Sequence, residues 1–251
     1  MTQNSLSLNF WHMRMLNLSS MFGLGEMSRD RSRALSIVYA ASISLMMGVN
    51  FIQPALPALT VPFAVSDSAL SLIMTLFTAP AIVLSPIFGI IADLYGRRLL
   101  LAGGLIIFGI FGTAMAFAPS FGWLLAFRTL QGVGFSAVIP LTIVLIGDLL
   151  EGEQEIGGQG LKVFLDRVGY MVFPPLGGLL ASIAWFWPFV FYVLTIPVGF
   201  AALFWMPETK GKHRDAGTLA YLGDMLRLTR HPRLVIAFSA GFLRFFLDYG
   251  F

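Results

Sequence analysis

The sequence contains no cysteine, so disulfide bonds and thiolate metal sites are excluded. Its three histidines are isolated at His12, His213 and His231, and none belongs to a metal-binding pattern. The sequence also lacks a nucleophile elbow and a phosphate-binding glycine loop. We therefore expect no metal, no cofactor and no enzymatic activity.

Charged residues are scarce as well. They form 12% of the chain, about half of the roughly 25% found in soluble domains, whereas hydrophobic residues form 57%. A soluble fold of 251 residues could not bury that much apolar surface, so the solvent must be lipid. The net charge of +3 is spread over connections, which is not typical of a nucleic-acid-binding surface.

Long apolar runs account for most of the chain. A bilayer core about 30 Å thick requires about 20 helical residues, and the runs lack the alternation of a membrane β-barrel. The sequence therefore predicts an all-α membrane protein. The predicted spans are residues 34–56, 69–91, 99–118, 122–146, 161–184 and 188–206, with a seventh from 234 to 251.

The basic residues predict the orientation. Except for Arg128 and Arg244, they lie in the N-terminal tail, in alternate connections or at neighbouring helix ends. Such an asymmetry places the N-terminus in the cytoplasm of a multi-pass protein of the cell (plasma or inner) membrane.

These spans predict four parts of the chain. We expect a cytoplasmic tail (1–33), a six-helix transmembrane bundle (34–206), a basic cytoplasmic linker (207–233) and the start of a seventh helix (234–251). This organisation looks like the first half of a twelve-helix protein whose C-terminal half is missing.

The connection between the second and third spans carries the densest motif, Gly-Ile-Ile-Ala-Asp-Leu-Tyr-Gly-Arg-Arg. Asp93 is expected to cap the following helix, and Gly96 permits a tight reversal. Arg97 and Arg98 hold the turn on the cytoplasmic side, while Gly89 opens the motif. An ordinary cytoplasmic turn is the alternative interpretation.

The fourth predicted span contains an arginine inside the bilayer, which is a functional hypothesis by default. Arg128 and Gln131 share a helix face, and Gly132 and Gly134 allow another helix to approach closely. The alternative is an arginine that snorkels to the outer interface. Arginine keeps its charge at ordinary pH, and no acidic residue of the six predicted spans lies at a comparable depth, so we expect the carboxylate partner of Arg128 in the missing half.

The fifth predicted span has a Gly-Tyr-Met-Val-Phe-Pro-Pro-Leu-Gly-Gly motif. It runs from Gly169 through Pro174 to Gly177 and Gly178, and the prolines are expected to bend the helix. Phe173 makes close helix packing at its own position unlikely.

Other polar residues leave alternatives open. Asn50 and Gln53, next to two prolines, either shape a helix end or line a polar substrate cavity. Asp148 belongs to a solvated loop or pairs with the arginines of the second connection. Asp166 and Arg167 form an interfacial charge pair or a substrate site.

Together the three motifs resemble those of the major facilitator superfamily, specifically its drug:proton antiporter branch, over residues 34–210. The resemblance implies two three-helix repeats with a substrate site near the midplane, and transport by alternating access. It implies a gate at the Gly89–Arg98 motif, a proton-coupling role for Arg128 and an antiporter motif in the fifth span. Protons and small amphipathic or cationic compounds would be the transported partners.

Two departures from the family pattern stand out. Phe173 occupies the place of a glycine, and residues 155–160 replace an arginine-glycine-arginine run. An uptake carrier, a sugar exporter and a fragment without transport activity of its own are the alternatives. A membrane-embedded enzyme is disfavoured because no catalytic cluster is present.

Overall fold

The computed structural model describes residues 27–209, 236, 239 and 240. The chain separates into two compact units, Met1–Lys210 and Gly211–Phe251. In the second unit, the three described residues are helical. Most of the predicted linker and seventh span, including Arg244 and Asp248, lies outside the described residues.

Within the described part of the chain, six helices are long and apolar enough to cross a membrane, which confirms the predicted all-α membrane fold. No strand occurs among the residues that the structure describes. The spans are α2 (Arg29–Asn50), α4 (Asp67–Tyr95), α5 (Arg97–Ala114) continued by η2 (Met115–Phe117), α6 (Phe121–Leu149), α7 (Glu153–Ile183), and α8 (Trp187–Val190) with η3 (Phe191–Leu194) and α9 (Thr195–Trp205).

The first span begins and ends earlier than predicted. The Ser28 hydroxyl accepts a hydrogen bond from the Arg31 N–H and so caps a helix that starts at Arg29. Pro54 has no N–H to continue the ladder, and α2 ends at Asn50. The 3₁₀ helix η1 (Gln53–Leu59) and the short α3 (Thr60–Phe63) then lead to α4.

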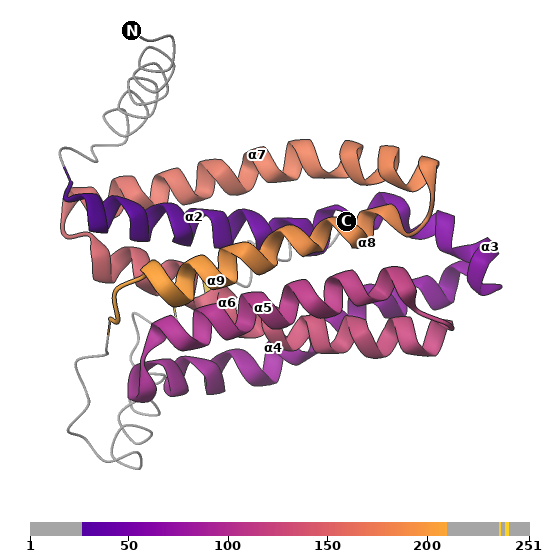
Figure 1. Cartoon of the computed structure of the whole chain (residues 1–251), viewed down its shortest axis with the longest axis horizontal. Helices are drawn as coiled ribbons and strands as arrows, with labels where there is room; N and C mark the ends of the chain where they lie inside the picture. Colours follow the sequence, from indigo (N-terminus) through magenta and orange to yellow (C-terminus); the bar gives the residue numbers. More distant parts are fainter. Residues whose placement is uncertain (1–26, 210–235, 237–238, 241–251) are drawn as a thin grey trace, which may run out of the picture. The chain divides into compact units, whose positions relative to one another are not determined.

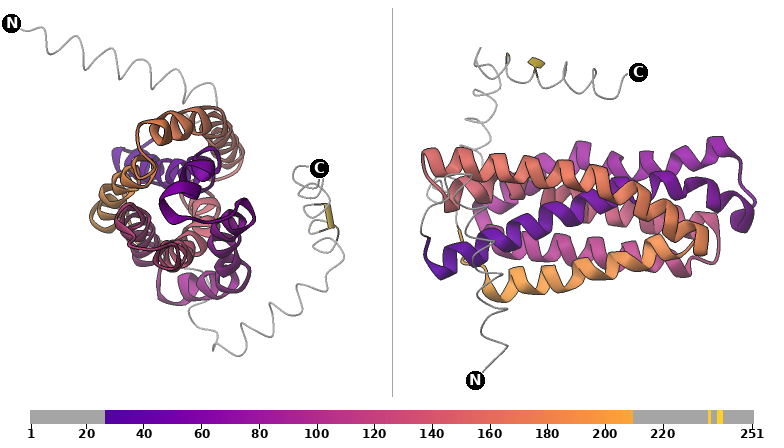
Figure 2. Two further views of the ribbon diagram at one scale, coloured as in Figure 1. Left: turned by 90° about the vertical axis from the view of Figure 1, so that its right-hand side faces the viewer. Right: turned by 90° about the horizontal axis from the view of Figure 1, so that it is seen from above.

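The spans of the first unit lie side by side as an antiparallel bundle (Figures 1 and 2). Helix α6 occupies the centre, where it packs against α2, α4 and α5. Helix α2 also contacts α7 and α9, and α5 contacts α9. In contrast, α4 and α7 leave most of their surfaces exposed, as expected of helices at the sides of a bundle.

Two glycines of α6 let neighbouring helices approach, as predicted. A Cβ at Gly132 would collide with the carbonyl oxygen of Phe77 in α4. A Cβ at Gly134 would lie 2.5 Å from the Gly104 carbonyl oxygen and 2.7 Å from the Phe108 nitrogen, both in α5. Backbone atoms block these positions, so they cannot yield as a flexible side chain would.

We therefore expect Gly134→Ala to lower the thermal unfolding midpoint of the purified protein. Alanine favours a helix over glycine by up to about 1 kcal/mol, but overpacking costs about 1–3 kcal/mol. Gly103→Ala is the matched control, because a Cβ there meets no atom within 4 Å. A Gly134→Ala midpoint equal to or above that of Gly103→Ala would contradict this packing.

Candidate functional site

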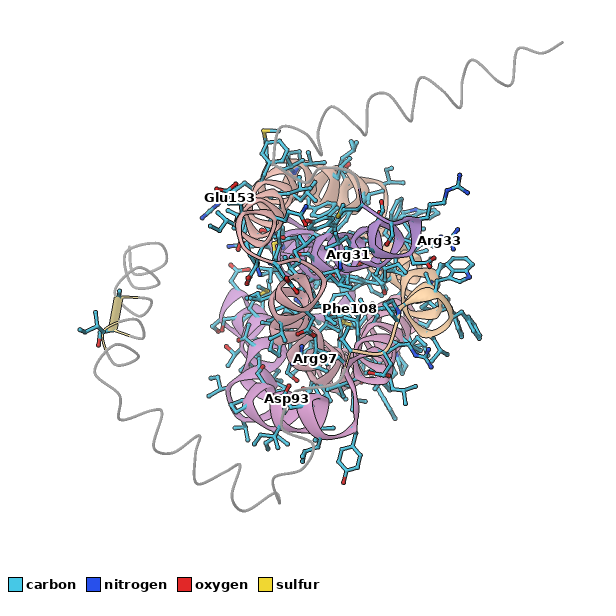
Figure 3. The ribbon with its side chains drawn as sticks, turned by 90° about the vertical axis from the view of Figure 1, so that its left-hand side faces the viewer. Arg31, Arg33, Asp93, Arg97, Phe108 and Glu153 are labelled. Carbon is cyan, nitrogen blue, oxygen red and sulfur yellow. The ribbon has the colours of Figure 1, made fainter. Side chains whose placement is uncertain are left out.

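Charged side chains gather at one end of the bundle, where α2, α5 and α7 begin and α4, α6 and α9 end. We call this the charged end, and Figure 3 views the bundle from it. Three of its arginines belong to the start of α2 and two to the start of α5. The connections at the opposite end, residues 51–66, 118–120 and 184–186, contain no lysine or arginine.

The turn between α4 and α5 depends on Gly96. Its φ of +112° is strained for any residue with a side chain, and a Cβ would lie 2.5 Å from a carboxylate oxygen of Glu208. That same oxygen, Oε1, accepts hydrogen bonds from the N–H groups of Arg97 (2.8 Å) and Arg98 (3.3 Å). Glu208 thus caps the start of α5.

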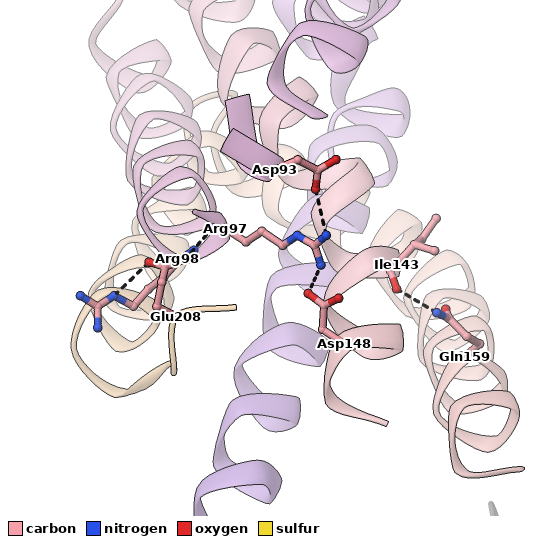
Figure 4. A network of polar contacts seen from close by, with 7 residues as sticks. All are labelled: Asp93, Arg97, Arg98, Ile143, Asp148, Gln159 and Glu208. Carbon is pink, nitrogen blue, oxygen red and sulfur yellow. Dashed lines mark hydrogen bonds and ion pairs between the residues drawn. The ribbon is translucent and has the colours of Figure 1, made fainter. Parts of the chain in front are cut away.

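The prediction that Asp93 caps α5 is therefore wrong. Asp93 lies in the last turn of α4, where a carboxylate opposes the helix dipole. It instead accepts a hydrogen bond from Nη2 of Arg97 at 2.9 Å. Of the two interpretations of Asp148, a residue of a solvated loop or a partner of the motif arginines, the structure shows the second, since Nη1 of Arg97 contacts Oδ2 of Asp148 (Figure 4).

Asp93, Arg97, Asp148 and Glu208 form what we call the helix-end network. It joins the ends of α4 and α6, the start of α5 and the segment after α9. The Arg97 side chain is only 9% exposed, so removing one of its carboxylates would leave a largely desolvated charge. Arg98 adds a longer contact to Glu208 at 3.9 Å and is much more exposed.

The structure assigns no contact role to Gly89, the first residue of the motif. A Cβ placed on it meets no atom within 4 Å. Packing within the described part of the chain therefore does not explain this glycine.

Arg128 is 0% exposed and lies about 10 Å along α6 from its start. Its guanidinium donates to three helices: to the Gly48 carbonyl of α2 (2.6 Å), the Ile73 carbonyl of α4 (3.3 Å) and the Gln131 amide oxygen of α6 (2.5 Å). Its Cζ atom also lies 3.9 Å from the ring centre of Phe77.

The alternative that Arg128 snorkels to the outer interface is wrong, because the side chain ends inside the bundle. The acceptors found for it among the described residues are neutral oxygens and a thioether, not a carboxylate. Arg128 thereby joins α2, α4 and α6.

Tyr192 of η3 binds the same turn of α2 as Arg128 does. Its hydroxyl donates to the Met47 carbonyl at 3.0 Å, next to the carbonyl that Arg128 holds. Its ring meets Phe108 edge-on at 5.5 Å between centroids. Two buried donors from α6 and η3 thus hold the last turn of α2 just before its break.

Asn50 and Gln53 are not brought together. Asn50 is buried, and its side-chain amide donates back to the Met46 carbonyl at 2.9 Å. Gln53 is exposed at the first position of η1. This geometry favours the interpretation that these residues shape a helix end.

The glycine motif of α7 packs against the end of α2. Gly177 lies so close to the carbonyl oxygen of Phe51 that a Cβ would collide with it, and a Cβ at Gly169 would lie 3.1 Å from that of Met46. A Cβ at Gly178 would make only an ordinary contact, 3.7 Å from the Cβ of Pro54.

Phe173, at the position expected to prevent close packing, stacks on the ring of Phe51 with 5.2 Å between centroids. An aromatic contact therefore replaces close backbone approach at this point. Helix α7 continues through Pro174 and Pro175 as one α-helix, and the expected bend remains a prediction.

Sequence reasoning missed two residues of these sites, Glu208 and Tyr192. Glu208 is 111 positions from the N–H group that it caps, and Tyr192 is 145 positions from its carbonyl acceptor. Glutamate after a helix and tyrosine in an aromatic-rich segment carry no local signal of these contacts. Among the described residues, no group of three or more His, Cys, Asp or Glu could hold a metal ion.

The Major Facilitator Superfamily model matches residues 38–251. The chain is 35% identical over 163 residues to the bacillibactin exporter of Bacillus subtilis (strain 168), an alignment covering 61% of this chain and 40% of that protein. It is 28% identical over 223 residues to the multidrug transporter protein MdtP of the same strain, covering 86% and 41%. It is 25% identical over 160 residues to the quinolone resistance protein NorA of Staphylococcus aureus, covering 64% and 41%. The matched region spans about two fifths of each relative.

We expect Glu208→Ala to accelerate hydrogen exchange at the first amides of α5. Loss of a helix cap costs about 0.5–2 kcal/mol, whereas Glu208→Gln keeps an acceptor oxygen and should have a smaller effect. Exchange is measured by mass spectrometry on a peptide that covers Arg97 and Arg98. Glu151→Ala, in an exposed connection, is the control. Equal exchange in Glu208→Ala and the control would show that Glu208 is not the cap.

Proposed function

The chain belongs to the Major Facilitator Superfamily, and on this premise we propose that the protein is a secondary transporter that exports small amphipathic or cationic compounds in exchange for protons. Its relatives are named as an exporter of bacillibactin, a multidrug transporter and a quinolone resistance protein. These names support export as the direction and small organic molecules as the substrate class.

The observation that carries the proposal is the buried Arg128. A charged side chain at membrane depth is expensive, by about 2.5–3.5 kcal/mol on insertion scales, and such residues mark substrate or ion pathways. Here the charge holds the end of α2 against α4 and α6. A ligand that changes the charge near Arg128 would therefore also change how firmly the end of α2 is held against α4 and α6.

The helix-end network supports a gate at the charged end. Its ion pairs join separate helices, so opening that end would require some of them to separate or exchange partners. In our proposal this end faces the cytoplasm, since basic residues are concentrated there.

We expect Asp93→Asn to leave the protein folded and to slow transport. The variant removes one of the two carboxylates that hold Arg97, which changes the balance between open and closed states. Initial transport rates are compared at matched membrane abundance with those of Asp67→Asn, which removes an exposed carboxylate from the start of α4. Equal rates in the two variants would show that Asp93 has no role in gating and is only a residue of the turn.

The proposed function itself is tested in vesicles that contain the intact protein and carry an imposed pH gradient. A panel of lipophilic cations supplies the substrates, and we expect saturable transport that collapses when the gradient is dissipated. Transport unaffected by the gradient would refute proton coupling.

The same assay tests Arg128. Lysine keeps the charge but loses the planar fork that reaches three acceptors, so Arg128→Lys should retain partial activity with an altered pH profile. Arg128→Ala leaves the Gly48 carbonyl without this donor and should abolish or uncouple transport. Arg33→Lys, at an exposed position of α2, is the control. A pH profile of Arg128→Lys identical to that of the control would contradict the assignment.

A further inference from the structure

A charged pair on α7, packed against α2, is satisfied within the protein. Nζ of Lys162 is 2.7 Å from Oδ2 of Asp166, and the Ser42 hydroxyl donates to Oδ1 of the same carboxylate at 2.6 Å. The expected pairing of Asp166 with Arg167 is therefore wrong. Asp166 lies about 20 Å from the start of α7 and about 26 Å from its end. The expectation that no acid of the six spans lies deep is thus also wrong.

The arginines at the start of α2 are not satisfied in this way. Arg29, Arg31 and Arg33 are all exposed. None of them forms an ion pair with a carboxylate of the described residues. Asp30 is the one acid among residues 27–36, so this segment carries three positive charges and one negative charge. Such an excess of exposed positive charge favours the binding of an anion.

Arg29 and Arg33 lie on the side of α2 that faces η3 and α9. They are four positions apart, and the same helical stripe continues through positions 37, 40 and 44 to Met47, whose carbonyl accepts the hydrogen bond of Tyr192. Helix α9 continues η3 and packs against α2. Arg31 is two positions from each of the other arginines and lies on another face of the helix. Figure 3 shows Arg33 at the rim of the bundle and Arg31 nearer the middle of the charged end.

The antiparallel arrangement brings Arg33 level with the end of α9. Tyr192 and Met47 mark a point where the two segments meet, and Arg33 lies 14 positions before Met47. Fourteen positions after Tyr192 the chain reaches Met206, directly after Trp205, the last residue of α9. Because the two segments run in opposite directions, Arg33 and Trp205 lie at similar heights along the bundle.

The end of α9 marks the level of the lipid headgroups. Trp205 is 64% exposed, and tryptophan is enriched at the interface between headgroups and acyl chains. Phe200 and Phe204 are exposed as well, and their stacked rings lie 6.4 Å apart along the helix. The two arginines therefore lie at the level of lipid phosphates, on a helix packed against one that presents an aromatic surface to the acyl chains.

We infer that this edge of the charged end binds an anionic phospholipid. We call it the α2–α9 edge, and it consists of Arg29, Arg33, Phe200, Phe204 and Trp205. The planar guanidinium groups donate hydrogen bonds to the phosphate, and the acyl chains lie against the exposed rings of α9.

Two other ligands fit the α2–α9 edge less well. A zwitterionic lipid carries an ammonium group, which the unpaired arginines repel. A soluble phosphate ester would satisfy the arginines but leave the aromatic rings uncovered. Basic residues beside membrane helices are a common means of binding anionic headgroups. The inference goes beyond the proposed function and does not require it.

Quenching of tryptophan fluorescence by brominated phospholipids tests the site, because bromine quenches only at short range. The intact protein in detergent is titrated with brominated phosphatidylglycerol, which is anionic, and with brominated phosphatidylcholine, which is zwitterionic. We expect saturable quenching at a lower concentration of the anionic lipid. Trp205→Phe should remove this saturable component.

Arg33→Gln should raise the half-saturating concentration of the anionic lipid about 5-fold, and Arg29→Gln/Arg33→Gln roughly 25-fold, from the contribution of each basic residue at a membrane surface. Arg31→Gln is the matched control, since it removes the same charge from another face of α2 and should have a much smaller effect. All three arginines are exposed, so these variants should fold, and gel filtration checks that they do.

Equal half-saturating concentrations of the two lipids, or saturable quenching that persists in Trp205→Phe, would overturn the inference. An effect of Arg31→Gln as large as that of Arg33→Gln would also overturn it, because any positive charge at the helix start would then suffice. Displacement of the lipid by an equal concentration of glycerol 3-phosphate would assign the arginines to a soluble phosphate ester instead. The assay does not involve transport, so lipid binding without gradient-driven transport would refute the proposed function and leave the site standing.

Discussion

A guanidinium inside an apolar layer has to find acceptors, and the arrangement of the central helices follows from how Arg128 finds them. It reaches carbonyl oxygens of α2 and α4 and an amide of its own helix. The approach of α4 depends on Gly132, one turn from Arg128, where only a hydrogen atom faces the carbonyl of Phe77. The Ile73 carbonyl that Arg128 binds lies one turn before Phe77 on α4. Gly132 and Arg128 therefore act on the same interface between α4 and α6. Gly132 lets the two helices come close, and Arg128 donates a hydrogen bond to the Ile73 carbonyl enclosed between them.

The six spans could be predicted because crossing a bilayer imposes a length and a hydropathy that single segments reveal. Where a predicted end differed, local chemistry explains the difference. Pro54 interrupts α2 before the apolar run is complete, and Ser28 starts the helix among basic residues. The pairing of Asp148 with Arg97 was also predictable, since both were expected on the same side of the membrane.

The charge partners were harder to predict. Asp93 was close enough in sequence to cap α5, but the cap comes from Glu208, which reaches the site only through the folding of the intervening helices. For Asp166 a local rule was sufficient. Adjacent residues on a helix do not face each other whereas residues four apart do, so Lys162 and not Arg167 was its natural partner. No comparable local rule predicts contacts between residues of different helices, such as the one between Tyr192 and Met47.

The cap supplied by Glu208 also sets an order of events during synthesis. The turn between α4 and α5 leaves the ribosome long before the carboxylate that completes it, because 111 residues separate Arg97 from Glu208. At about 5–20 residues per second, this delay amounts to roughly 6–22 s. Throughout that interval the first N–H groups of α5 lack the acceptor that they have in the folded chain. Only after α9 has been made can the turn take its final form, so its closure reports that all six spans have been synthesised.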